Sequence, residues 1–87
     1  MAKINFKEFK LYVDISREST RDFDIRKDFS NFMYLNCRGI QAHDIALRIY
    51  HSDGELEFND SDMAVIQGAA NMVGGTFIDS LPLNISE

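Results

Sequence analysis

The sequence has few of the residues that constrain a chain covalently or locally. Its 87 residues include one cysteine, one proline and no tryptophan. The single cysteine, Cys37, excludes an internal disulfide and any zinc site built from several thiolates. A reducing compartment would keep it as a free thiol. No apolar run approaches the roughly 18 residues of a membrane span, and the first ten residues lack the apolar region of a secretory signal. We therefore predict a cytoplasmic protein without membrane contact.

Lysine and arginine are absent from residues 49–87. All nine basic residues lie in residues 1–48, where seven acidic residues leave a charge of +2, whereas residues 49–87 carry seven acidic residues and a charge of −7. Five of the latter lie close together along the chain: Asp53, Glu55, Glu57, Asp60 and Asp62. The formal net charge of −5 speaks against direct nucleic-acid binding, which usually requires a basic surface.

The apolar residues of the chain are numerous enough to form one hydrophobic core. Apolar residues make up 45% of the chain and aromatic residues 11%, which argues against disorder. A chain of this length forms one domain of modest stability, so we predict a single domain over residues 1–87. The sequence shows no internal repeat, low-complexity segment or linker.

The clearest periodic pattern lies in residues 39–73. Apolar residues recur there at helical spacing in two sets: Ala42, Ile45, Ala46 and Ile49, then Met63, Ile66, Ala70 and Val73. Between the two predicted helices, Asp53-Gly54 predicts a tight turn with a left-handed glycine, and residues 55–58 alternate as a short strand. Asn59 and Asp62 have the spacing of a weak capping box at the start of the second helix.

The segment before residue 39 predicts a strand and a helix. Alternating apolar residues predict a strand over 9–15, with a break in phase near Lys7-Glu8. Residues 16–21 read as a polar loop. Asp22 or Asp24 would then cap a helix, with an apolar face formed by Ile25, Phe29, Phe32, Met33 and Asn36 or Cys37.

The residues after 74 are open to two interpretations. Thr76 could cap a short helix that ends at Pro82, or residues 81–85 could alternate as an edge strand. We favour a short helix followed by an extended end. The predicted fold is thus α+β, with three main helices on a thin sheet of one long N-terminal strand and one short strand near Leu56–Phe58. The short strand would pair with the strand over 9–15.

A resemblance covers most of the chain. The run from Gly39-Ile40 through Ala42-His43 to Ser52-Asp53-Gly54-Glu55 resembles short uncharacterised bacterial and prophage proteins that share a GIxAHxIAxxIYxSDGExE-like stretch. Those proteins also tend to carry an Asp-x-Arg helix, here at residues 24–26, and a Phe-Ile-Asp near the end, here at residues 77–79. The resemblance implies a phage or mobile-element setting and supplies no activity.

No residue set in the sequence matches a known catalytic or metal site. An EF-hand loop around Gly54 fails, because its first and third ligand positions would be Ile49 and His51. His43 and His51, with Asp44 and Asp53, lack a metal-binding spacing. Cys37 lacks the surroundings of a nucleophile. We predict a protein that is not an enzyme and has no catalytic residue, metal or cofactor.

The residues that remain point to protein contacts. The five acidic residues named above form a candidate partner-binding surface, and Gly68 within a helix suggests a close approach inside the molecule or across a homodimer. We predict a non-catalytic accessory protein with a protein partner of unknown identity, one form of which is self-association. The alternative is an acidic inhibitor that imitates nucleic acid and occupies a basic site on a host protein. A more distant alternative is a small enzyme or metal protein that uses His43 and His51.

Overall fold

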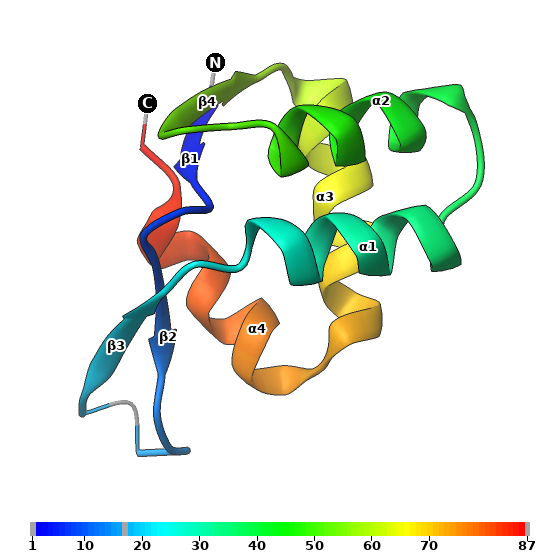
Figure 1. Cartoon of the computed structure of the whole chain (residues 1–87). Helices are drawn as coiled ribbons and strands as arrows, with labels where there is room; N and C mark the ends of the chain where they lie inside the picture. The colour runs from blue at the N-terminus through cyan, green and yellow to red at the C-terminus, as the bar shows by residue number, and fades with distance from the viewer. Residues whose placement is uncertain (1, 17, 87) are drawn as a thin grey trace.

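The computed structural model describes residues 2–16 and 18–86 (Figure 1). These residues form four α-helices, one 3₁₀ helix and two separate two-stranded antiparallel sheets. The elements are β1 (Ala2–Asn5), β2 (Phe9–Tyr12), β3 (Thr20–Phe23), α1 (Arg26–Asn36), α2 (Ile40–Tyr50), β4 (Glu55–Phe58), α3 (Asp60–Val73), α4 (Gly75–Ser80) and η1 (Leu81–Asn84). The α+β class is confirmed, but the single thin sheet is corrected to two sheets and the three helices to four.

The first sheet joins β1 to β4. Ala2 lies opposite Phe58 and Asn5 opposite Glu55, so the predicted pairing of β4 with the strand over 9–15 is wrong. The break in phase at Lys7-Glu8 explains this. The Asn5 side-chain carbonyl accepts hydrogen bonds from the backbone N–H groups of Lys7 and Glu8, at 3.0 and 3.2 Å. This Asx-type turn divides the N-terminal segment into two strands that enter different sheets.

The second sheet is a ribbon of β2 and β3. The strand predicted over 9–15 ends at Tyr12, and Val13 and Ile15 are 47% and 98% exposed. β3 lies where a polar loop and a helix cap at Asp22 were predicted, and all four of its residues are exposed. Figure 1 shows the ribbon extending away from the helices. A strand with no buried face carries no period-two signal, so the sequence pattern could not reveal it.

The C-terminal segment covers the other edge of β2. The Asn84 side chain accepts a hydrogen bond from Lys10 N and donates one to Lys10 O, at 2.7 and 2.9 Å. Ser80 Oγ accepts a hydrogen bond from Tyr12 N at 3.0 Å. The predicted short helix is confirmed, although Thr76 lies inside α4 and Gly74 takes the capping position. The predicted end at Pro82 and the extended residues after it are corrected, because residues 81–84 form a 3₁₀ helix and only Ile85 and Ser86 follow as extended chain. Pro82 lies in the first turn of η1.

The helical stripes are largely confirmed. All four predicted apolar residues of α2 are buried, and α1 packs against α2 with Phe29 and Met33 inward. The residue before α1 is Ile25, whose side chain makes no capping bond. Asp24 instead accepts a hydrogen bond from the backbone N–H of Arg26 at 3.2 Å. The predicted cap is thus one residue out of place.

α3 begins with the predicted capping box between Asn59 and Asp62. Its buried residues include Met63, Ile66 and Ala70, but Val73 is 42% exposed. Gly74 ends the helix at a φ of +139°, in the region that favours glycine. Gly54 has no positive φ, so the predicted left-handed turn there is wrong.

Four phenylalanine rings hold the core together. Phe6 stacks on Phe9 and Phe29, and Phe77 stacks on the same two rings, with centroid distances from 4.8 to 5.8 Å. Phe58 and Phe6 form an edge-to-face pair with ring centroids 6.1 Å apart. The closed circuit of four rings joins the β1–β2 turn, β2, α1 and α4. These contacts fix the orientation of the surfaces described below.

Candidate functional site

Three of the five predicted acidic residues are paired with basic side chains. The Asp53 carboxylate lies 3.0 Å from Lys7 Nζ, and Glu57 lies 3.7 Å from Lys3 Nζ. The hydrogen bond and charge of Lys7 lower the pKa of Asp53. Both pairs are largely exposed, where such contacts add little to stability.

Asp62 is the most enclosed of the five. Its carboxylate accepts hydrogen bonds from Gln41 Nε2 and from Arg48 Nη2, both at 3.0 Å, and it completes the capping box of α3. The hydrogen bond from Gln41, together with Arg48, lowers its pKa below the usual range. Arg48 also lies over the Phe58 ring, 5.1 Å from its centroid. Asp62 therefore links α2 to α3 and is not a free charge.

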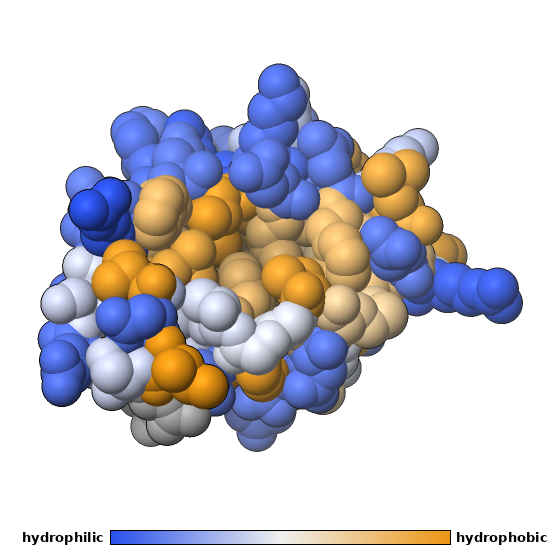
Figure 2. All heavy atoms as spheres, turned by 90° about the horizontal axis from the view of Figure 1, so that it is seen from below, coloured by the Kyte–Doolittle hydropathy of each residue, from blue (hydrophilic) through white to orange (hydrophobic). Residues whose placement is uncertain are grey.

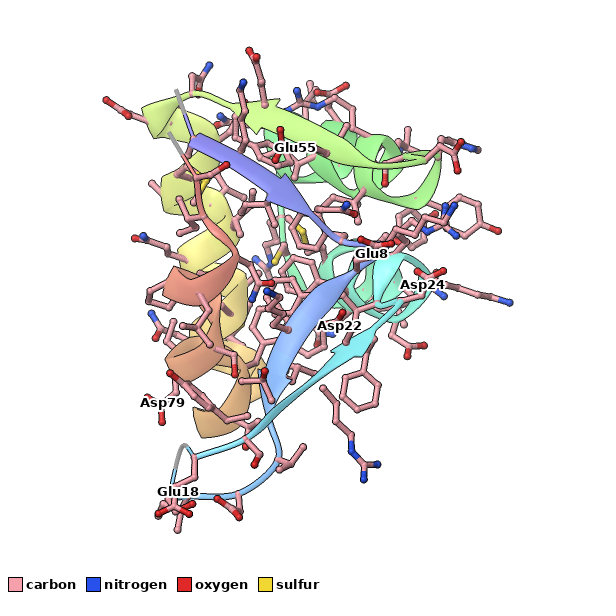
Figure 3. All side chains as sticks on the ribbon, turned by 90° about the vertical axis from the view of Figure 1, so that its left-hand side faces the viewer. Glu8, Glu18, Asp22, Asp24, Glu55 and Asp79 are labelled. Atoms are coloured by element: carbon pink, nitrogen blue, oxygen red, sulfur yellow. The ribbon has the colours of Figure 1, made fainter. Side chains whose placement is uncertain are left out.

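Glu55 and Asp60 are exposed, and no basic side chain among residues 2–16 and 18–86 forms an ion pair with either carboxylate. Figure 3 looks onto the outer face of β1 and β4, with the helices behind and Glu55 on that face. The five acidic residues thus lie on the turn, β4 and the start of α3, but as two free carboxylates and three paired ones. This arrangement reduces the free negative charge that a nucleic-acid mimic would require.

An apolar groove opens on the face opposite the acidic residues. Figure 2 shows it as a hollow lined by apolar side chains and framed by hydrophilic ones. Its first part has a volume of about 310 Å³, and its second part, of about 280 Å³, shares Val73 and Phe77 with it. We call the two parts the underside groove. Its lining consists of Leu11, Ile25, Asp28, Phe29, Phe32, Val73, Gly74, Gly75, Thr76 and Phe77.

Four of the groove residues, Ile25, Phe29, Phe32 and Val73, were predicted to lie on the buried faces of helices, whereas Phe77 fell in the segment left open to two interpretations. Phe29 and Phe77 are 3% and 7% exposed and form the floor, whereas Phe32 is only half-buried and Val73 is exposed at the end of α3. The apolar stripe of α1 is wider than the neighbouring elements can cover. The width of the apolar stripe on α1 is the sequence signal that could have indicated this surface. Whether the stripe is too wide can be judged only when the neighbouring helices are known.

A second hollow lies between α1 and α2. It measures about 240 Å³ and is lined by Ser30, Asn31, Tyr34, Ala46, Leu47, Tyr50 and His51. His51 contacts the Tyr50 ring, and His43 contacts the Tyr34 ring, with centroid distances of 5.1 and 5.4 Å. No group of three or more metal-ligating side chains occurs in the part of the chain that the structure describes.

Cys37 is half-buried at the end of α1. Burial raises the pKa of its thiol, which disfavours the thiolate that nucleophilic chemistry requires. Its surroundings resemble those of a packed cysteine.

Across residues 2–16 and 18–86, no helix combines the length and apolar character needed to cross a membrane. No protein-family model, curated protein or solved structure matches the chain. The fold and the two hollows define a small α+β domain with open apolar surface. No family can be assigned beyond this class.

Proposed function

We propose that this chain is a non-catalytic binding module that contacts another protein through the underside groove. The observation that carries the proposal is the groove itself. Apolar side chains from α1, α3 and α4 converge there and leave a hollow open to solvent (Figure 2). Contiguous exposed apolar surface with a polar rim is typical of protein interaction sites.

The composition of the groove supports protein contact over small-molecule chemistry. Its lining contains one ionisable residue, Asp28, which is exposed. Small-molecule sites usually add several convergent polar groups to an apolar hollow. Aromatic side chains with little polar decoration instead suit an apolar anchor residue from a partner.

Two exposed neighbours on α3 provide a matched pair of variants. Val73 lines both parts of the groove and is 42% exposed, whereas Met72 is 53% exposed and lies outside the lining. Lysine at either position lies in the last turn of α3, where the helix dipole favours a cation. Val73→Lys and Met72→Lys should therefore leave stability nearly equal while only the first blocks the groove.

The test is affinity capture from bacterial extract with wild type and both variants as bait, followed by titration with the purified partner. We expect a partner bound by wild type and by Met72→Lys, and at least tenfold weaker binding by Val73→Lys. Equal binding by all three baits would place the contact elsewhere and refute the proposal.

Self-association through the same groove is one form of the proposal. Sedimentation of the wild type at micromolar concentration would then show a dimer that Val73→Lys converts to a monomer. Gly68 offers a second surface, because it is exposed and a Cβ there would meet nothing within 4 Å. The predicted close approach to Gly68 inside the molecule is therefore wrong, and Gly68→Leu tests a contact between copies there. The phage or mobile-element setting stays a prediction.

A further inference from the structure

The chain covers some of its strand edges and leaves others open. The free edge of β1 pairs with Ser86 through two backbone hydrogen bonds with Lys3, at 2.7 and 2.9 Å. The free edge of β2 is covered by Asn84 and Ser80. Among the described residues no strand pairs with the outer edges of β3 and β4. An open strand edge is a template for an added strand.

The direction of the backbone groups in β4 follows from these bonds. In an antiparallel strand the N–H and C=O of one residue point to the same side, and successive residues alternate. Both backbone groups of Lys3 point to Ser86, so those of Ala2 and Ile4 point to β4. Their partners in register are Phe58 and Leu56. The backbone groups of Glu55 and Glu57 therefore point to the open edge.

The side chains of the same two residues are also exposed. Leu56 and Phe58 face the core, so Glu55 and Glu57 share the outer face of the sheet, where Figure 3 shows Glu55. Each of these residues offers an added strand a backbone donor, a backbone acceptor and a carboxylate. The Glu55 carboxylate has no basic partner among the described residues, whereas that of Glu57 lies 3.7 Å from Lys3 Nζ and would share its charge with an added cation. Residues of the added strand that lie opposite Glu55 and Glu57 would place their side chains beside these carboxylates.

The charges at this edge select the occupant. A second copy of β4 paired antiparallel about Leu56 would place Glu55 opposite Glu57 of the other copy, and like charges in that position are destabilising. The edge of β3 offers no comparable pair of like charges. The β3 residues whose backbone groups point outward are Thr20 and Asp22, because their partners Tyr12 and Lys10 direct their own groups to Ser80 and Asn84. A strand with basic residues two positions apart would meet both carboxylates of β4.

We propose that the outer edge of β4 binds an extended segment of another protein with the pattern basic–apolar–basic. The backbone groups of Glu55 and Glu57 hydrogen-bond to the segment, and their carboxylates pair with its two cations. The apolar residue between the cations lies on the same side of the sheet as Leu56. This site is separate from the underside groove and does not depend on it.

Synthetic peptides test the proposal. The probe is an end-blocked peptide Thr-Lys-Val-Lys-Thr, compared with the isomer Thr-Val-Lys-Lys-Thr, whose adjacent lysines point to opposite faces. A third peptide has the first sequence with both lysine backbone nitrogens methylated. We expect the first peptide to bind at least fivefold more tightly than the other two, with an affinity that falls as salt rises.

Variants and hydrogen exchange identify the edge. Glu55→Gln and Glu57→Gln should each weaken binding of the first peptide about 2- to 5-fold, as expected for an exposed ion pair, whereas Asp60→Asn and Val73→Lys should not. In NMR exchange experiments the amides of Glu55 and Glu57 should exchange rapidly in the free protein and slow at least fivefold with saturating peptide. Equal affinity for all three peptides, no measurable binding, or unchanged exchange at these two amides would overturn the proposal.

Discussion

Asp62 shows how one residue serves two structural roles. It lies at the third position of α3, where a carboxylate can accept from the capping residue, and this role is visible in the spacing from Asn59. Its bonds to Gln41 and Arg48 come from residues 21 and 14 positions away. The sequence could predict the cap but not the link to α2, because that link exists only after the two helices pack.

The pH dependence of stability should report the Asp62 link. Its pKa is lowered in the folded chain, so the folded state binds this proton more weakly than the unfolded state. The resulting stabilisation is complete above the unfolded pKa of about 3.9 and disappears as pH falls through the folded pKa. Asp62→Asn should be about 1 kcal/mol less stable than wild type at pH 7. The difference should shrink below pH 4.

Urea unfolding from pH 7 to pH 3 measures this difference. Asp60→Asn makes the same charge change in the same helical turn, at an exposed position with no ion pair among the described residues. It should show no comparable narrowing. A gap between wild type and Asp62→Asn that stays constant down to pH 3 would contradict the assignment.

At the scale of elements, prediction from the sequence succeeded where the spacing of apolar residues itself indicates which face of the element is buried. The bounds of β4 and the start of α3 were found because Leu56 and Phe58 alternate and Asn59 caps. β3 was missed because it pairs with β2 alone among the described strands and all four of its residues are exposed. The pairing of β1 with β4 joins residues 50 to 56 positions apart, and local periodicity does not encode such contacts.

The glycines beside and within α3 should respond oppositely to alanine. Gly68 lies in the helix interior, where a Cβ meets nothing within 4 Å, and Gly→Ala there gains about 0.5–1 kcal/mol of helix stability. Gly74 has a φ of +139° and a ψ of 176°, a region nearly confined to glycine, so Gly74→Ala should cost about 1–3 kcal/mol.

Thermal and urea unfolding of the two variants check these signs. If Gly68→Ala destabilises the protein, position 68 is in contact with something outside the described chain, and sedimentation should then show a loss of self-association. A neutral Gly74→Ala would mean that the backbone after α3 relaxes without cost. Together, the two variants distinguish the effect of helix propensity at position 68 from the effect of backbone geometry at position 74.

For the whole molecule, the decisive contacts are the four stacked rings that connect both ends of the chain. Sequence patterns placed Phe9 and Phe29 inward and left Phe77 in an ambiguous tail. The underside groove follows from the same arrangement, because α4 covers Phe9 and Phe29 with one ring and leaves the end of α1 open. Neither the ring circuit nor the groove could be predicted from single elements, since both depend on how four of them meet.

Phe77→Leu tests whether the tail is part of the cooperative unit. The change removes two stacked contacts and leaves unfilled volume, for an expected loss of about 1–3 kcal/mol. Leu83→Ala, at a position of the same tail that is 46% exposed, should cost less than about 0.5 kcal/mol. If α4 packs onto a core that is stable without it, Phe77→Leu should lower hydrogen-exchange protection within α4 and leave the protection of the Met33 amide in α1 unchanged. Because Phe77 stacks on Phe29 as well as Phe9, we expect protection at Met33 to fall by the same free energy as global stability.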